Sequence, residues 1–584
     1  MVEDSQANPT DPADMLVVDF ATRVGSWTYV TGWAGPRVSG IGAGPLHDCI
    51  VQRHDRPDVS DVYGLRTGQG LGFVAAIPAP AGDLAGDLAG DLALGWVSPA
   101  SAGPQQTPLE IRETWSDQDL NSLMPMIERQ ARDLPRGSAD WVSHAVLLSD
   151  AMAGSTRTRG HVDRILQHET QGYAVSGWAI GRENTEFFLM DAAQTVVPLT
   201  GMDRLDRPDL LSIEGVSPNQ AARAGFVAHI RQDLVAPIQF IAATGDTVLL
   251  LSKKPIQPEP LPADPKEAAR ALFAMHTPIQ SFHDRVERID WKFLAPVIAA
   301  SQARWAECEI EERAFGPQPE APEVSVIVPL YGRHDFVEHQ LMEFCRDPYM
   351  RERAEIVYVV DDPAIVISSG SELAELYGLY RQPFRWIWGG VNRGFSGANN
   401  LGAARARADR LLFMNSDVFP TRPGWLAEMV AALDSHPKLG VVTPQLRFAG
   451  GGIQHAGMES RRLDSIGVWI NHHPHMGFDP ALDPRKALDA VPIATGACML
   501  LRRGEFEELG GWDTGYLIGD FEDSDLCYKY RSRDLDIGYL PTVSLVHLER
   551  QSFSGIGSDD FKTRVMIANS VRHSGRWPQF LNAD

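Results

Sequence analysis

From Val324 onward the sequence alternates short apolar runs with helical stretches, and no other feature limits the possible fold as tightly. Each apolar run is too short for a helix and is bounded by polar residues, so it reads as a buried strand. The predicted strands are Val324–Leu330, Glu355–Val360, Phe384–Trp388 and Leu411–Met414. The first two are separated by an amphipathic helical stretch, Asp335–Cys345. This alternation predicts an α/β domain whose parallel strands are joined by right-handed crossovers.

Polar residues follow three of these strands where each one ends: Pro329–Arg333, Asp361 with Asp362, and Asn415–Asp417. In an open α/β sheet, ligands bind just beyond the carboxyl ends of the strands, so these residues could face one cleft. An aspartate in that place, such as Asp417, can bind a hard divalent cation, and the cation can hold a diphosphate. The alternative is that each acid only caps the turn after its strand.

Five motifs in this order resemble the family 2 glycosyltransferases. They are VSVIVPLYGR, VVDD, NRGFSGANNLGAARARADRLLFMNSDVFPTRPGWL, ATGACMLLRRGEFEELGGWD and GDFEDSDLCYKYR. The likeness covers about Val324–Phe553 and is strongest to the bacterial rhamnosyltransferase and galactofuranosyltransferase branch. It implies a GT-A fold, which is a Rossmann-like mixed sheet. It also implies an inverting transfer from a nucleotide-diphosphate sugar to a hydroxyl of a glycan or lipid-linked acceptor, in bacterial surface polysaccharide synthesis.

The resemblance implies a donor site, residue by residue. In the family, the first acidic motif, here Asp361 and Asp362, contacts the nucleoside. The loop Asn392–Gly394 lies beneath the nucleotide, where its arginine could offset phosphate charge. Asn415 stands in place of the first acid of the family's DXD motif, which bears on how tightly a metal is held. The expected donor-binding residues are Pro329, Tyr331, Asp361, Asp362, Asn392, Arg393, Gly394, Asn415 and Ser416.

The same resemblance implies a metal site and a general base. Asp417 and His547 match the metal ligands, and the expected ion is Mn²⁺ or Mg²⁺, since imidazole and carboxylate can share one divalent cation. Asp523, next to Glu522, matches the family's base, and this pair is the expected catalytic group. Acids crowded in this way repel one another, which is tolerated where one must act as a base or a metal is near. The same charges would also complement a helix dipole.

Other interpretations stay open. Trp512 and Asp513 match the acceptor segment of the family, but a packed tryptophan beside a turn acid explains them as well. The cluster His472–His475 lacks the spacing of a standard zinc site. The domain could be a catalytically degenerate transferase that binds glycan or acts as a scaffold, which Asn415 favours. A nucleotidyltransferase would need a glycine-rich pyrophosphate loop, and the sequence PLYGRHD is a poor version of one.

The N-terminal half of the chain contains a repeat. The sequence GWA at 32–34 is repeated at 177–179, RPD at 56–58 is repeated at 207–209, and GFVA at 72–75 is repeated at 225–228. Each copy is short and rich in predicted strands, which indicates two small β-sandwich domains. Trp33 and Trp178 could stack on sugar rings or fill the two cores. The AGDL repeats at 81–95 are interpreted as a loop expansion.

These patterns predict seven segments along the chain. They are a disordered start at 1–14, β-sandwich copies at 15–105 and 161–252 around a helical connector at 106–160, a proline-rich linker with a helical region at 253–323, the transferase domain at 324–553 and a helical tail at 554–584. The helical regions could mediate oligomerisation.

Charge and composition restrict the partners. The net charge of −23 excludes a surface built for nucleic acid, because no basic field would attract phosphate backbones. The five cysteines are scattered without a CxxC pair, which suits a reducing cytosol. Neither a secretory signal nor an apolar run of about 18 residues is present, so no membrane-spanning helix is expected. The expected location is the cytoplasm, and peripheral contact with the inner face of the membrane stays open.

Overall fold

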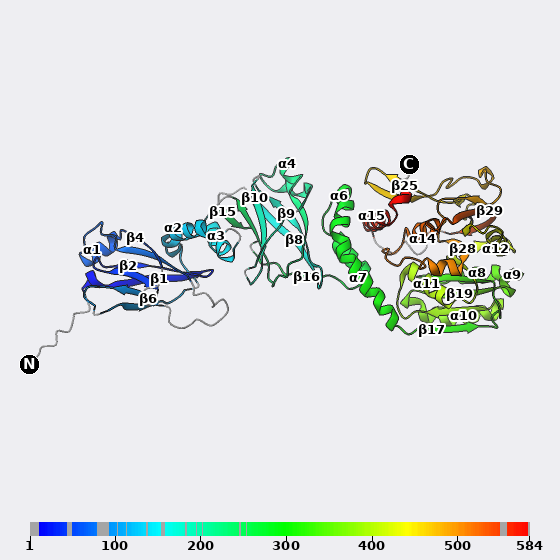
Figure 1. The fold of residues 1–584 in the computed structure, drawn as a ribbon, viewed down its shortest axis with the longest axis horizontal. Helices are drawn as coiled ribbons and strands as arrows, with labels where there is room; N and C mark the ends of the chain where they lie inside the picture. The colour runs from blue at the N-terminus through cyan, green and yellow to red at the C-terminus, as the bar shows by residue number, and fades with distance from the viewer. Residues whose placement is uncertain are drawn as a thin grey trace, which may run out of the picture. The chain divides into compact units, whose positions relative to one another are not determined.

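The computed structural model describes residues 11–581 apart from 44–48, 79–92, 102, 113, 136–137, 153–157, 182–183, 194, 201, 245–246, 253 and 549–557. The chain divides into two compact units (Figure 1). The first contains Met1–Ile165 and Val175–Glu259, and the second contains Leu166–Ala174 and Pro260–Asp584. Most of the disordered segment predicted at 1–14, and most of the AGDL repeats, lie outside the described residues.

The first unit contains the first copy of the repeat and most of the second copy, whose segment Leu166–Ala174 belongs to the second unit. In the first copy, one sheet has the order β1 (Leu16–Val24), β2 (Trp27–Ala34), β5 (Gly72–Pro78), β4 (Ile50–His54), and another has the order β3 (Ser39–Ala43), β6 (Ala93–Val97), β7 (Gln105–Pro108). In the second copy, the orders are β12 (Asp203–Leu205), β13 (Gly225–Ile230), β9 (Gly172–Ile180), β8 (Arg159–His168), β16 (Glu259–Pro260), and β11 (Val196–Pro198), β10 (Thr185–Met190), β14 (Gln239–Thr244), β15 (Thr247–Leu250). The short helices of this unit are α1 (Pro57–Tyr63) and α4 (Pro218–Ala221), and its longer helices are α2 (Asp117–Asp133) and α3 (Ala139–Met152).

One sheet of each copy corresponds strand for strand, because the order β1-β2-β5-β4 matches β8-β9-β13-β12. Apolar side chains from both sheets of the first copy share one core, to which β2 contributes Val30 and β6 contributes Leu94. Trp33 is 4% exposed, with its ring centroid 4.9 Å from that of Tyr63, so it is a core residue. That each copy is an independent β-sandwich domain stays a prediction, since the first copy and most of the second belong to one compact unit.

The second unit begins with a layer of helices. They are α5 (Pro265–Phe273), α6 (Ile279–Arg285), a π-helical turn (Val286–Asp290), α7 (Trp291–Ala303) and a 3-10 turn (Arg304–Glu307). The fully buried Arg285 pairs with the fully buried Asp290 at 3.1 Å and donates to the Met275 carbonyl at 2.8 Å, which ties the layer together. The helical region predicted up to residue 323 ends earlier, because Glu311–Phe315 forms strand β17 of the following sheet.

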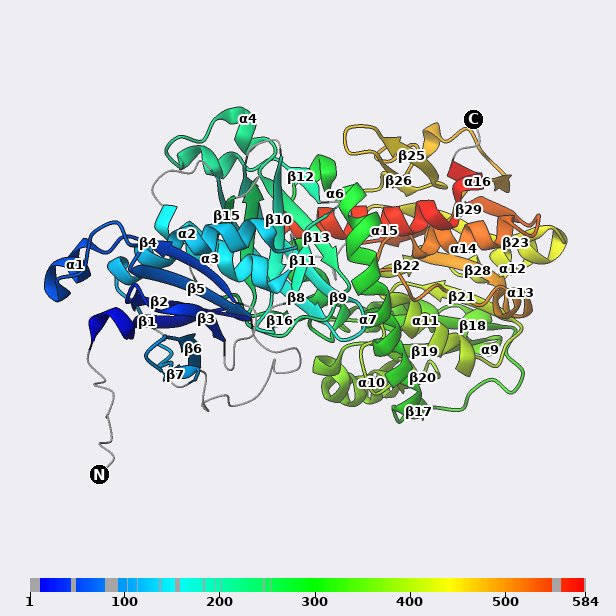
Figure 2. The ribbon, with the colours of Figure 1, turned by 60° about the vertical axis from the view of Figure 1, so that its left-hand side comes forward.

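A large mixed sheet is the framework of this unit (Figures 1 and 2). Its strands run in the order β17, β20 (Phe384–Trp388), β19 (Ala354–Val360), β18 (Val324–Leu330), β21 (Arg410–Met414), β28 (Cys498–Arg502), β23 (Leu439–Arg447), β29 (Asp536–His547), β22 (Val418–Pro420). Two short strands join it at the side, β24 (Ile453–His455) and β27 (Asp489–Ala490), and β25 (Glu459–Leu463) pairs with β26 (Val468–His472) as a separate hairpin. The neighbours β20, β19, β18 and β21 are parallel, as the sequence predicts.

Helices cover both faces of this sheet, which explains why its central strands are apolar throughout. Along β18, Val326 and Val328 belong to one core with side chains of α8 (Phe336–Phe344), α9 (Pro348–Glu352), α10 (Val366–Tyr380) and α12 (Trp425–Ser435). Ile327 between them belongs to a second core with side chains of α11 (Gly394–Arg405), α13 (Arg503–Glu508) and α14 (Glu522–Arg531). The C-terminal helices are α15 (Asp559–Arg576) and α16 (Pro578–Leu581), within the segment predicted as a helical tail. None of the helices in the described ranges is long and apolar enough to cross a membrane.

Candidate active site

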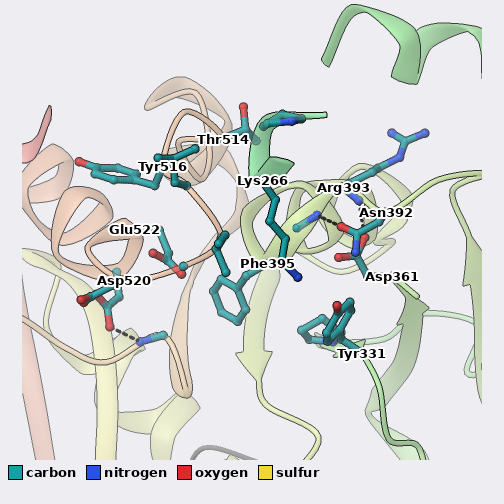
Figure 3. Close-up of a pocket in the computed structure, with 18 of the residues that line it drawn as sticks. Lys266, Tyr331, Asp361, Asn392, Arg393, Phe395, Thr514, Tyr516, Asp520 and Glu522 are labelled. Carbon is teal, nitrogen blue, oxygen red and sulfur yellow. Dashed lines mark hydrogen bonds between the residues drawn. The ribbon is translucent and has the colours of Figure 1, made fainter. Parts of the chain in front are cut away.

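A cavity of about 770 Å³ lies beyond the carboxyl ends of β18, β19 and β21 (Figure 3). The structure brings twelve of the fifteen predicted site residues to its wall: Pro329, Tyr331, Asp361, Asn392, Arg393, Gly394, Asn415, Ser416, Asp417, Glu522, Asp523 and His547. The three others, Asp362, Trp512 and Asp513, are not among the residues that line it. Groups that are up to about 220 positions apart in the chain therefore share one concave space.

Asp361 fixes the loop that enters α11. Its side chain is 4% exposed and accepts a hydrogen bond of 2.6 Å from the backbone N–H of Arg393. Burial raises the pKa of this carboxyl well above its usual range, although that hydrogen bond opposes the shift. Next along the loop, the Asn392 side chain accepts from the Gly394 N–H at 2.9 Å. Gly394 has φ +70°, a conformation that glycine adopts without strain.

Asp362, just after β19, forms hydrogen bonds to two turns, one after β18 and one after β19. It accepts from the backbone N–H of Gly332 at 3.1 Å and from that of Ala364 at 2.9 Å. These two bonds fit the alternative given above, in which a strand-end acid caps the turn after its strand. Asp362 thus shapes the segment carrying Tyr331, which is itself part of the cavity wall.

Asp417 and His547 are neighbours because β22 pairs with β29 and the register sets Val418 opposite His547. The Asp417 carboxylate lies 3.3 Å from His547 Nε2. On the other side of the ring, His547 Nδ1 lies 2.6 Å from the Gln454 side-chain carbonyl, whose amide nitrogen donates to the His547 carbonyl at 3.4 Å. A carbonyl only accepts, so Nδ1 carries the proton, and the neutral ring would present a lone pair at Nε2 to the carboxylate. A cation placed between that lone pair and the carboxylate would bind both groups.

That pair fits a divalent cation held jointly with a diphosphate. A neutral imidazole fixed through its other nitrogen, together with a carboxylate, is a donor set that Mn²⁺ accepts. No cluster of three or more histidine, cysteine or acidic ligands occurs among the residues with described positions. The remaining ligands would therefore come from phosphate and water, as Mg²⁺ sites at nucleotides commonly use.

Asp523 lies in the first turn of α14 and faces the cavity. Its two oxygens accept from the backbone N–H groups of Gly496 at 3.2 Å and Ser524 at 2.8 Å. Burial raises its pKa above the usual value, and these two hydrogen bonds limit the rise. A methyl group at position 496 would lie 3.4 Å from the Asp523 side chain and closer to two aromatic rings, so glycine suits this close approach.

Glu522 is more deeply buried than its neighbour. It is 8% exposed, and one of its oxygens has no hydrogen-bond partner among the residues the structure describes. Burial first, and then the negative charge of Asp523, raise the pKa of Glu522 well above its usual range. Adjacent acids of one turn thus have different environments, which matches the pattern of paired acids in active sites.

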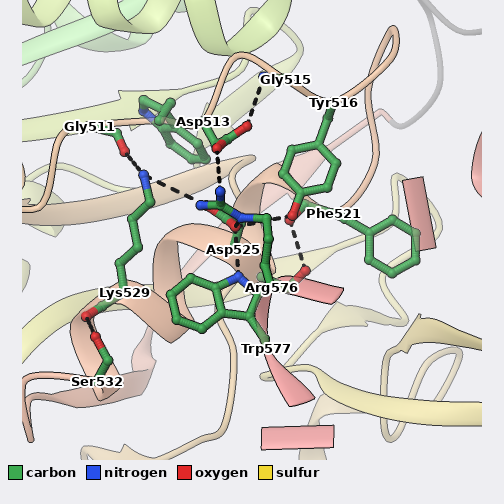
Figure 4. Close-up of polar contacts among 12 residues, drawn as sticks. Gly511, Asp513, Gly515, Tyr516, Phe521, Asp525, Lys529, Ser532, Arg576 and Trp577 are labelled. Carbon is green, nitrogen blue, oxygen red and sulfur yellow. Dashed lines mark hydrogen bonds and ion pairs between the residues drawn. The ribbon is translucent and has the colours of Figure 1, made fainter. Parts of the chain in front are cut away.

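Trp512 and Asp513 make contacts outside the cavity wall, and Figure 4 shows Asp513 near Arg576. Trp512 is 1% exposed and packs edge to face on Phe395 with centroids 5.4 Å apart. Asp513 pairs with Arg572 at 2.8 Å and with Arg576 at 3.1 Å on α15. Although burial acts to raise the pKa of Asp513, these guanidinium groups hold it below its usual value.

The segment between Asp513 and α14 carries unusual backbone conformations. Ile518, Asp520 and Phe521 have φ of 64°, 83° and 75°, although none is glycine. Ile518 and Asp520 line the cavity. The fully buried Asn569 of α15 accepts from the Leu517 N–H at 2.9 Å and donates to the carbonyls of Leu517 and Gly519 at 2.9 and 2.8 Å. A side chain from the C-terminal helix therefore holds the strained segment.

Sequence reasoning missed the contribution of the helical layer. Lys266, Gln302 and Trp305 line the cavity, although they precede the predicted domain. Gln302 donates to the Thr514 carbonyl at 2.7 Å. Arg393, expected to offset phosphate charge, donates through Nη2 to the carbonyls of Gly389 at 2.8 Å and Trp305 at 3.2 Å, and it lies 5.5 Å from the Trp305 ring. No motif marks these helical residues, because their side chains are ordinary for amphipathic helices.

The histidine-rich segment forms part of the β25–β26 hairpin and the turn after it. His473 Nδ1 lies 3.4 Å from Nδ1 of the buried His455. Burial lowers the pKa of His473 to about 4 and that of His455 well below its usual value, so both rings are neutral near pH 7. They pack behind His547 and are not among the residues lining the cavity.

The fold and the strand-end acids define an α/β protein with a nucleotide-type site beyond its parallel strands. Residues 325–510 match the family described as Glycosyl transferase family 2, and the chain therefore carries a family 2 glycosyltransferase domain in its C-terminal half.

Several known proteins are similar to this region. An uncharacterized protein, y4gI, of Sinorhizobium fredii is 30% identical over 246 residues, which are 41% of this chain and 26% of that protein. The O-antigen biosynthesis protein RfbC of Myxococcus xanthus is 26% identical over 253 residues, which are 42% of this chain and 18% of RfbC. The chain thus covers about a quarter or less of these two relatives.

Two further comparisons concern named glycosyltransferases. The low-salt glycan biosynthesis hexosyltransferase Agl10 of Haloferax volcanii is 23% identical over 254 residues, which are 40% of this chain and 74% of Agl10. Among solved structures, that of GalNAc-T7 with UDP, GalNAc and Mn²⁺ has a TM-score of 0.35 at 18% identity, covering 44% of this chain and 49% of the other.

Proposed function

We propose that this protein is an inverting glycosyltransferase that moves a sugar from a nucleotide-diphosphate sugar to a hydroxyl of a glycan or lipid-linked acceptor. The observation that carries the proposal is the gathering of Asp361, Asp417 and Asp523 from three separate elements around one cavity. The family match and the relatives named for O-antigen and glycan biosynthesis support it and favour surface polysaccharide as the product.

The donor occupies the side of the cavity formed by the strand ends. Asp361 and the loop from Asn392 to Gly394 receive the nucleoside, since carboxylate and amide oxygens accept from base and ribose groups. Pro329 and Tyr331 form the adjoining wall, and Asn415 and Ser416 continue it toward Asp417. Asp417 and His547 would hold a divalent cation, which would supply positive charge to the departing diphosphate.

Asp523 is the base in this mechanism. As the acceptor oxygen attacks C1 of the sugar, a C–O bond forms, the bond from C1 to the diphosphate breaks, and the hydroxyl proton passes to the Asp523 carboxylate. Attack opposite the leaving group inverts the configuration at C1. The raised pKa of Asp523 makes its carboxylate a better proton acceptor than an exposed aspartate. Glu522 and the segment Thr514–Asp520 complete the acceptor side.

A degenerate transferase that only binds glycan is the second candidate. Asn415 favours it, because an amide replaces one charge of the expected metal motif. The active transferase turns over a nucleotide sugar and the degenerate one does not, so a single turnover assay distinguishes them.

The test is release of nucleoside diphosphate from a panel of nucleotide sugars with Mn²⁺, followed by mass spectrometry. The full chain should release product from at least one donor, and Asp523→Asn should lower the transfer rate by at least about 10²-fold, the size of a general-base effect, with donor affinity kept. The matched control is Asp536→Asn, which changes an exposed aspartate outside the cavity. Full transfer by Asp523→Asn would show that the base is elsewhere, and no turnover with any donor would favour the degenerate candidate.

A further inference from the structure

We propose that Lys266, on the first helix of the layer that precedes the sheet, binds the diphosphate of the donor. The inference rests on the proposed function and adds to it a phosphate-binding residue from outside the family-matched region, which spans residues 325–510. Lys266 is the second residue of α5 and lines the cavity.

The first support is the charge balance of the cavity. Seven acidic residues line it, namely Asp264, Glu267, Asp361, Asp417, Asp520, Glu522 and Asp523. The lining cations in the described part of the chain are Lys266 and Arg393, beside the His547 imidazole. A diphosphate carries negative charge on both phosphates, and an acid-lined space repels it unless cations compensate. The site thus needs basic groups that are free to meet a ligand.

The second support is that one end of the Arg393 guanidinium is already engaged. Its Nη2 donates to the carbonyls of Gly389 and Trp305, and the group lies over the Trp305 ring. By contrast, no described residue forms a hydrogen bond or ion pair with the Lys266 amine in this structure. Figure 3 shows the Lys266 side chain extending into the cavity, where its terminal nitrogen is drawn between Phe395 and Tyr331.

The third support is that helix stability does not explain a lysine at this position. Asp264 caps α5 by accepting from the backbone N–H groups of Lys266 and Glu267, both at 3.0 Å, and Pro265 occupies the first helical position. A cation in the first turn opposes the helix dipole, which favours acids there. A lysine held at a position that α5 itself disfavours, and directed into a cavity, is consistent with a ligand-binding role.

The helical layer is also held in place firmly enough to position this amine. Gln302 and Trp305, at the far end of the layer, contact the Thr514 carbonyl and Arg393 respectively. Trp291 on α7 donates to the Ala568 carbonyl of α15 at 3.0 Å. The layer therefore contacts both the loop Asn392–Gly394 and helix α15.

The experiment compares a nucleoside diphosphate with its nucleoside. UDP, GDP and dTDP, each with Mn²⁺, are titrated into the full chain by calorimetry, and the tightest binder is kept together with its nucleoside. Lys266→Met keeps the length of the side chain and removes its charge. We expect it to weaken nucleoside diphosphate binding about tenfold or more, the effect of losing one charge-assisted hydrogen bond, and to leave nucleoside binding unchanged. Lys266→Arg should recover most of the loss.

Two controls separate this inference from the proposed function. Lys292→Met changes an exposed lysine of α7 outside the cavity and should bind like the wild type. Asp361→Asn should weaken both nucleoside and nucleoside diphosphate, because it acts on the nucleoside end. If Asp361→Asn behaves so and Lys266→Met binds the nucleoside diphosphate normally, the lysine assignment is overturned and the proposed function stands. If the wild type binds none of the three nucleotides, both are overturned.

Discussion

Two adjacent acids in the first turn of α14 show how environment separates residues of nearly the same chemistry. Asp523 receives backbone hydrogen bonds on both oxygens, whereas Glu522 is 8% exposed and has one oxygen without a partner in the described structure. An ionised carboxyl that is buried with one oxygen unpaired lowers the stability of the folded state. Such a group is kept where the site uses it. At Glu522, a buried acid that lines the cavity therefore lowers the stability of the fold.

Glu522→Gln should stabilise the fold above neutral pH. Because the pKa of Glu522 is raised by folding, the folded state binds more protons than the unfolded chain between the two pKa values, and stability falls as pH rises through that window. The glutamine does not titrate, so its gain in Tm should be largest near pH 8 and disappear near pH 4. A gain of roughly 2–4 °C for each kcal/mol is expected.

Differential scanning calorimetry across pH measures this gain, with Glu508→Gln as the control, since Glu508 is an exposed acid on α13. A Tm difference for Glu522→Gln that stays the same from pH 4 to pH 8 would contradict the pKa direction assigned to this side chain.

Among the elements, α15 contacts the segment that the proposed function assigns to the acceptor side. Asn569 holds the carbonyl and amide groups of the segment around Leu517, where three non-glycine residues have positive φ. Such conformations persist only where surrounding contacts determine them. Asp513 and Asp525 add ion pairs to α15, through Arg576 at 3.1 and 2.8 Å. The helix thus maintains the part of the wall that carries Tyr516 and Asp520.

Asn569→Ala should release this segment. The substitution leaves two carbonyls and one N–H without their partner, which costs about 1–3 kcal/mol for each buried group that water cannot reach. Because the segment lines the acceptor side, the apparent KM for the acceptor should rise, while nucleoside diphosphate affinity should stay near that of the wild type. Steady-state kinetics with both substrates varied give the two values.

Asn569→Asp is the matched variant, since it keeps the acceptor for the Leu517 N–H and loses both donor bonds. It should lose at least as much as Asn569→Ala, because a buried carboxylate oxygen would face the lone pairs of both carbonyls. Equal losses of donor and acceptor affinity in the alanine variant would mean that α15 supports the whole fold and has no particular effect on the acceptor side.

The elements also show what the sequence predicts well. The four parallel strands and the polar groups after them follow from apolar runs that stop abruptly, a signal that depends only on local composition. Strand β17 was missed because Glu311–Phe315 is an edge strand with charged, exposed side chains. The roles of Lys266 and Asn569, which lie on helices, do not follow from the sequence for another reason. Amphipathic spacing indicates that a helix face is buried, but it does not tell which distant loop that face contacts.

For the whole molecule, every described residue that lines the cavity lies in the second compact unit. None of the first unit's residues with described positions therefore lines this site. The helical layer, by contrast, precedes the region that matches the family and still lines the cavity. The chain that forms the site thus begins well before the first motif strand, and shortening the protein to residue 324 would remove Lys266, Gln302 and Trp305.

The central claim is that one cavity holds a nucleotide between Asp361 and a cation at Asp417. Crystals of the full chain soaked with MnCl₂ and the nucleoside diphosphate that binds most tightly test it directly, with manganese located by its anomalous scattering. We predict an anomalous peak in contact with Asp417 and His547 Nε2, the diphosphate beside it, and the nucleoside against Asp361. A nucleotide bound outside this cavity, or manganese that contacts neither Asp417 nor His547, would contradict the account.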